Sequence, residues 1–162
     1  MQLAAQILEA FSLEPVPAEP LLEAGYLDPA NQGDEGATEY FLGKRWDSLD
    51  VENLRYHAIA LYMFTPEAHR YYLPAFMVAT LTHPAEADVI PENILFHFAR
   101  FEEPFWSKRI QALSASQREV VASFLRATSH NVVDKRHLEA ALRGLAQGGQ
   151  MPNNSLERTR DR

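Results

Sequence analysis

Apolar residues recur every three or four positions along most of the chain, which is the spacing of a buried helix face. Leu3, Ile7 and Phe11 show it first and predict a helix over residues 2–13. Prolines within residues 15–20 end that helix, because proline cannot continue the hydrogen-bond ladder. No segment alternates strictly between apolar and polar residues as a half-buried strand does. The pattern therefore predicts an all-α fold, a single-domain helical bundle.

The centre of the chain contains the most apolar stretches. Asp47 and Ser48 offer capping oxygens for a helix over residues 50–64. The second half of this helix, residues 58–64, is apolar on every side and must therefore be buried on every side. Residues 25–36, which precede the region, are rich in Gly, Asp and Asn and predict a long loop.

A second central helix is expected to begin at Thr65. Threonine caps the helix, Pro66 takes the first helical position, and Glu67 favours the positive end of the helix dipole. Pro74 lies inside the next apolar run, residues 71–81. Because proline lacks an N–H and crowds the carbonyl four residues before it, we expect a bend or break just before Pro74. The expected core of the two helices consists of Ile59, Leu61, Phe64, Phe76, Val78 and Leu81.

The last part of the chain carries three more helix starts. Acids precede Pro104 at the first of them, and Ser114 with Gln117 fits a capping box at the second. Asp134 can cap the last helix, and the glycine pair at residues 148–149 ends it.

Charge is distributed unevenly along the chain. The net charge of −7 is carried by residues 1–43, which contain eight acids and no lysine or arginine, whereas the remainder sums to +1. Such a segment repels phosphate backbones, so nucleic-acid binding is disfavoured, and it attracts basic protein surfaces. We therefore expect an acidic N-terminal arm at residues 1–45, a helical core domain at residues 46–147 and a disordered tail at residues 148–162.

Several classes of function are disfavoured by missing residues. The chain has no cysteine, so it has no disulfide, zinc–thiolate site or cysteine nucleophile. No apolar run reaches the roughly 18 residues that a membrane span needs, and no signal segment follows Met1. We expect a cytoplasmic protein that does not contact membranes. Phosphate-loop, serine-hydrolase and paired metal-ligand spacings do not occur, so we expect no catalytic residue, no metal site and no cofactor.

Two alternative functions remain open, and the first of them concerns the six histidines. None has another histidine three or four residues away, but His57 and His69 flank one predicted helix junction. With Glu67 they are the candidate ligands or acid–base groups of a small enzyme or metal protein. The other alternative is a helical domain that binds a small apolar ligand.

Aromatic residues beside arginines indicate a binding surface, because tryptophan and arginine dominate binding hot spots. Two tryptophans lie at predicted helix starts, and Arg100 belongs to a run rich in phenylalanine over residues 96–109. With three acids of the arm, they make up the expected partner-binding set: Asp34, Glu35, Glu39, Trp46, Arg100 and Trp106.

The segment from Phe64 to Met77, with the strings T-P-E-A and Y-Y-L-P-A, resembles a small bacterial family known only as a domain of unknown function. Matching residues begin at Trp46, and the resemblance covers roughly residues 40–127. Members of that family are short, soluble and helical, so the resemblance implies a bacterial cytoplasmic protein with one domain. No activity, cofactor or catalytic residue comes with it.

The favoured interpretation is a non-enzymatic, acidic protein-binding module, either an adaptor or an immunity-type inhibitor of a basic toxin. Its expected partner is a basic protein. The sequence pattern leaves the oligomeric state open.

Overall fold

The structure, a computed structural model, describes residues 2–27, 36–130 and 135–150. Within these ranges it contains ten α-helices, two short 3-10 helices and no strand beyond one isolated bridge, so the all-α prediction is confirmed. The elements in chain order are α1 (Gln2–Phe11), η1 (Ala24–Tyr26), α2 (Ala37–Phe41), η2 (Trp46–Ser48), α3 (Val51–Tyr56), α4 (Ala60–Met63), α5 (Pro66–Thr82), α6 (Pro84–Ala87), α7 (Ile90–Ala99), α8 (Pro104–Ala112), α9 (Ala115–Thr128) and α10 (Lys135–Ala146).

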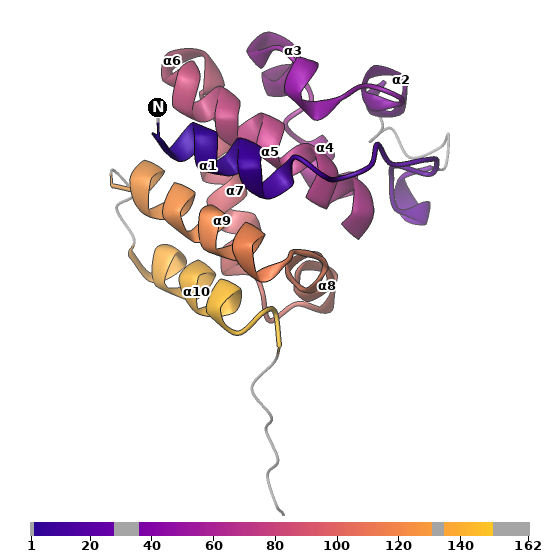
Figure 1. Cartoon of the computed structure of the whole chain (residues 1–162). Helices are drawn as coiled ribbons and strands as arrows, with labels where there is room; N and C mark the ends of the chain where they lie inside the picture. Colours follow the sequence, from indigo (N-terminus) through magenta and orange to yellow (C-terminus); the bar gives the residue numbers. More distant parts are fainter. Residues whose placement is uncertain (1, 28–35, 131–134, 151–162) are drawn as a thin grey trace, which may run out of the picture.

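Helix α5 lies at the centre of the bundle (Figure 1). It contacts α1, α3, α6, α7 and α8. Helix α9 lies between α1 and α10, and α10 also covers α7. Helices α1 and α9 are therefore neighbours although they are far apart in the sequence. None of the described helices is both long enough and apolar enough to span a bilayer.

Two helix starts have the predicted caps. The Thr65 hydroxyl accepts a hydrogen bond from the backbone N–H of Ala68 at 3.2 Å, and Pro66 follows as the first helical residue. At α9, the Ser114 hydroxyl accepts from the backbone N–H of Gln117, and the Gln117 side chain accepts from the backbone N–H of Ser114. Both caps satisfy N–H groups that have no partner inside the helix.

We expected a bend or a break before Pro74, and the break does not occur. Helix α5 runs without interruption through all of its 17 residues, with Pro74 inside it. Pro74 cannot donate to the carbonyl of Arg70, which costs the helix one hydrogen bond. Residues 71–77 are all buried, however, so the helix is packed on every side. These packing contacts stabilise the helical conformation despite the missing hydrogen bond.

The helix predicted over residues 50–64 is divided into α3 and α4. The Asp50 side chain caps the start of α3 by accepting a hydrogen bond from the backbone N–H of Asn53. Phe64 then pairs with Leu22 in the isolated antiparallel bridge. The division leaves 49% of Ile59 exposed, so the prediction that Ile59 is buried is wrong. Beside this bridge the backbone N–H of Glu23 donates to the carbonyl of Met63, and that of Thr65 donates to the carbonyl of Leu21, so backbone groups just after α4 find partners outside the helix.

The other predicted core residues lie in the interior to different degrees. Leu61, Phe64 and Phe76 are buried, whereas Val78 and Leu81 are half-buried against the same core. The interior of the bundle therefore follows the sequence pattern more closely than its edges do.

The described part of the predicted acidic arm belongs to the core. Ile7, Phe11, Leu22 and Phe41 have no exposed surface. These four side chains pack into the same hydrophobic core as the central helices. The apolar stripe of α1 faces α5 and α9, while its one acid, Glu9, is exposed.

Helix α10 fits closely against the rest of the bundle. Gly144 makes this possible, because a Cβ there would overlap the Phe101 side chain. The first residues of the predicted tail also pack, since Gly149 is buried and its carbonyl accepts a hydrogen bond from the Ser107 hydroxyl at 2.9 Å. The rest of that predicted tail, residues 151–162, lies outside the described residues, as does the predicted cap Asp134.

Candidate functional site

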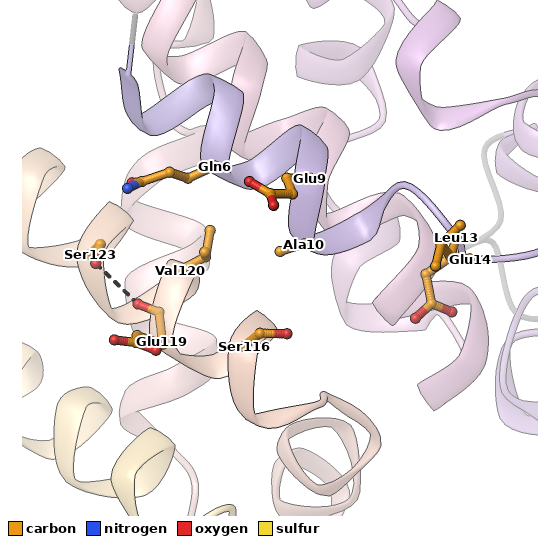
Figure 2. A pocket seen from close by; sticks show the side chains of 9 residues that line it. All are labelled: Gln6, Glu9, Ala10, Leu13, Glu14, Ser116, Glu119, Val120 and Ser123. Carbon is orange, nitrogen blue, oxygen red and sulfur yellow. Dashed lines mark hydrogen bonds between the residues drawn. The ribbon is translucent and has the colours of Figure 1, made fainter.

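A groove of about 570 Å³ lies between α1 and α9 (Figure 2). Helix α1 and the residues after it supply one wall, and the first three turns of α9 supply the other. Its lining residues are Gln6, Glu9, Ala10, Leu13, Glu14, Ser116, Glu119, Val120 and Ser123. We refer to it as the α1–α9 groove.

The α1–α9 groove combines an apolar floor with carboxylates. Ala10 and Val120 supply the apolar contacts, and Glu9 and Glu119 stand on opposite walls (Figure 2). Within the described residues neither of these carboxylates has an ion pair or a hydrogen-bond donor. Leu13, at one end, is 95% exposed. The groove therefore offers uncompensated negative charge beside apolar surface.

The remaining acid of the groove is already used. The Glu14 carboxylate forms an ion pair with Arg70 at 3.0 Å and accepts a hydrogen bond from the Gln117 side chain at 2.8 Å. Gln117 also donates to the carbonyl of Ala10 at 3.2 Å, so the start of α9 is tied to the end of α1. These contacts set the width of the groove.

A second cluster of polar residues lies in the interior, and Arg109 is its centre. The Arg109 guanidinium is 1% exposed and donates to the carbonyls of Phe105 and Phe64. It also binds Oε1 of Glu23 at 3.0 Å and lies 3.5 Å from the centre of the Phe105 ring. Helix α8 is thereby linked to the N-terminal segment.

Two buried histidines complete this interior cluster, which we call the Arg109 cluster (Arg109, Glu23, His69, His97 and Trp106). His97 stacks on Trp106 with ring centres 4.2 Å apart, and His69 lies 6.2 Å from Trp106. None of the four imidazole nitrogens has a hydrogen-bond partner. Burial, and secondarily the positive charge of Arg109, lower the pKa of His69 to about 3.

The same physics acts on His97. Burial, followed by the charges of His69, Arg100 and Arg109, lowers the pKa of His97 well below its usual value. Both imidazoles are therefore neutral at physiological pH. A neutral ring can be buried among aromatic side chains at lower cost than an imidazolium ion.

The candidate metal or acid–base set does not gather in space. His57 stacks on Tyr40, with ring centres 4.8 Å apart, whereas His69 lies in the Arg109 cluster and Glu67 is exposed on α5. Among the described residues, no group of three His, Cys, Asp or Glu side chains is arranged to hold a metal ion.

The residues of the expected partner-binding set have different surroundings. Trp46 and Trp106 are 7% and 3% exposed, so they have little surface to offer a partner. Arg100 is exposed and pairs with Glu103 at 2.8 Å, and Glu39 is exposed on α2. Asp34 and Glu35 lie outside the described residues.

Sequence reasoning missed the groove acids and two of the buried basic residues, Arg109 and His97. Glu9 and Glu119 lie on polar faces of amphipathic helices, where a carboxylate is common. Nothing in the local sequence distinguishes Arg109 from its neighbour Lys108. The position of His97 in an apolar run could have indicated that it is buried. That position does not show which side chains surround it in the fold.

Comparison with known proteins assigns the chain to a family. A family described as a family of unknown function, DUF6714, has a model that matches residues 2–147, and the chain belongs to this family. The match confirms the resemblance and extends it beyond residues 40–127, because it includes the acidic arm and α10. No curated protein and no solved structure matches the chain.

Proposed function

We propose that this member of DUF6714 is a non-enzymatic protein-binding module whose α1–α9 groove receives a basic, partly apolar segment of another protein. One observation carries the proposal: Glu9 and Glu119 line the groove beside the apolar floor of Ala10 and Val120, and within the described residues neither carboxylate forms an ion pair. Lysine or arginine side chains of a partner would supply the missing charges, and an apolar side chain would cover the floor.

The charge of the whole protein supports the same partner. The net charge is −7, and the net negative charge is concentrated in residues 1–43, which include α1 and contain no lysine or arginine. A field of one sign raises the association rate of an oppositely charged partner and depends on salt. Leu13, 95% exposed at the end of the groove, adds apolar surface that a partner would bury.

The test compares two pairs of substitutions that change the charge equally. Glu9→Gln with Glu119→Gln neutralises the groove, and Glu86→Gln with Glu92→Gln neutralises two exposed acids on α6 and α7. Proteins captured from the native host by the unsubstituted chain are identified, purified and measured for association rate at several salt concentrations.

The groove pair is expected to lower the association rate about tenfold at low salt and to flatten its salt dependence, while the control pair changes little. Equal binding by both pairs would contradict the proposal, and so would association that is insensitive to salt. A partner with an activity would also separate two roles, because an immunity-type inhibitor blocks that activity and an adaptor leaves it intact.

The acids predicted from the sequence belong to the same hypothesis. Asp34, Glu35 and Glu39 would extend the negative surface of the N-terminal segment. Their triple replacement by neutral residues is expected to weaken binding of the same partner most at low salt, because exposed rim charges act mainly on the association rate.

A further inference from the structure

A hollow of about 550 Å³ lies between η1 and α8, on the outer side of the Arg109 cluster. Its lining residues are Glu23, Ala24, Gly25, Tyr26, Phe105, Lys108 and Arg109. This volume falls within the range of about 300–1,000 Å³ that is typical of small-molecule sites. It is separate from the α1–α9 groove, because the two share no lining residue.

Positive charge prevails in the hollow, although the protein as a whole is acidic. Two bases, Lys108 and Arg109, face one acid, Glu23. Lys108 is exposed and has no ion pair or side-chain hydrogen bond within the described residues. A base without a partner at the edge of a concave surface favours an anionic ligand.

The guanidinium of Arg109 is only partly satisfied. Glu23 reaches it through one oxygen, Oε1, which accepts from Nη2 at 3.0 Å. The neighbouring Nε is buried and has no hydrogen-bond partner. A carboxylate can bind an arginine through two parallel hydrogen bonds, and here one of the two is missing. Buried donors without acceptors are uncommon in folded proteins and indicate a missing partner.

The walls of the hollow are aromatic as well as charged. Phe105 and Tyr26 are half-buried and line it. The backbone N–H of Glu23 donates to the carbonyl of Met63 at 2.8 Å, so the start of η1 is held in place while the Glu23 side chain is 37% exposed. The side chain can therefore leave Arg109 without displacing the backbone.

From these observations we propose that the hollow between η1 and α8 binds a small organic acid with a flat apolar body. Its carboxylate binds Lys108 and competes with Glu23 for Arg109, and its apolar body packs on Tyr26 and Phe105. The site is independent of the proposed protein-binding groove.

The experiment uses the full-length, isotopically labelled protein and follows its backbone amide resonances by NMR. The probes are benzoate, its neutral analogue benzamide, and inorganic phosphate. Benzoate is expected to shift resonances of residues 24–26 and 105–109 in a saturable way, with a dissociation constant of about 1 mM. Benzamide and phosphate are expected to bind at least about tenfold more weakly, because each lacks one of the two required features.

Two substitutions should act in opposite directions. Lys108→Met removes the unpartnered base and is expected to weaken benzoate binding about tenfold. Glu23→Gln keeps an oxygen for Arg109 but removes the competing charge, and it is expected to tighten binding about threefold. Lys135→Met, at the exposed start of α10, is the control for charge and should change nothing.

Three outcomes would overturn the proposal. The first is that benzoate causes resonance shifts that do not saturate or that occur elsewhere on the protein. The second is that benzamide or phosphate binds as tightly as benzoate. The third is that Lys108→Met and Lys135→Met have equal effects on benzoate binding. Lys108 is exposed, so its variant is expected to fold and to keep the test informative even if Glu23→Gln is unstable.

Discussion

The Arg109 cluster and the α1–α9 groove both contain charged side chains, but they use charge in opposite ways. In the cluster, Arg109 is 1% exposed and donates to two backbone carbonyls and to Glu23. In the groove, Glu9 and Glu119 have no partner within the described residues. A buried charge that is hydrogen-bonded contributes to the structure, whereas a solvated charge adds little stability and stays available for binding.

The largest effect is expected from Arg109→Met. It removes the donor of the Phe64 and Phe105 carbonyls and leaves Glu23 without its base. Although Glu23 is 37% exposed, the loss of these three hydrogen bonds from a charged donor is expected to cost about 3–5 kcal/mol of the free energy of unfolding, because each such bond contributes about 1.5–3 kcal/mol. Urea denaturation measures this loss. Arg100→Met is the control, because Arg100 and its partner Glu103 are both exposed, and the loss of free energy of unfolding should stay under about 1 kcal/mol.

Phe76→Ala tests the interior where no charge is involved. Phe76 has no exposed surface, so its truncation is expected to lower the free energy of unfolding by about 3–5 kcal/mol. Ile59→Ala, at a residue that is 49% exposed, should cost about 1 kcal/mol or less. A loss below about 1 kcal/mol for Phe76→Ala would show that this residue lies on a surface.

The buried histidines make the interior sensitive to acid. The pKa of His69 is about 3 in the folded state, below the ordinary histidine value of 6.5. Between these pH values the unfolded chain binds a proton that the folded protein refuses. The stability contributed by neutral His69 is therefore complete above about pH 6.5 and is lost as the pH falls towards about 3, at about 1.4 kcal/mol per pH unit.

Denaturation at a series of pH values between 7 and 4 measures that slope. His69→Gln should make the slope shallower, because the substituted side chain takes up no proton. His83→Gln, at an exposed histidine, is the matched control. Equal slopes for the unsubstituted chain and His69→Gln would contradict the prediction.

The smallest effect is expected in the groove. Glu9→Gln with Glu119→Gln should change the free energy of unfolding by no more than about 0.5 kcal/mol, because neither carboxylate has a partner to lose. Glu14→Gln should cost about 1 kcal/mol, since it breaks the partly buried ion pair with Arg70. Thermal unfolding of the two variants measures both changes in stability. A large loss from the first pair would make the groove a structural feature.

Local sequence was a good guide wherever the cause of a structure is local. The caps at Thr65 and Ser114 depend on side chains that reach only three residues along the chain, so both could be predicted. The buried positions Leu61 and Phe76 follow from apolar runs too continuous to be solvated on any side.

Local sequence was a poor guide wherever distant segments meet. A break at Pro74 was expected from a local property of proline, its missing N–H. Helix α5 is nevertheless continuous, because the helices packed around it stabilise its backbone. The interruption between α3 and α4 accompanies the bridge from Leu22 to Phe64, 42 residues away in the sequence, which periodicity cannot show.

The sequence by itself determined the helical class, the main helix starts, the apolar interior and the concentration of acid near the N-terminus. Only the tertiary structure decided which acids face a groove, that the N-terminal segment packs into the core, and that Arg109, His69 and His97 share one buried cluster. The physical reason is range. Periodicity and capping act within a few residues, whereas burial and ion pairing depend on which segments the folded chain brings into contact.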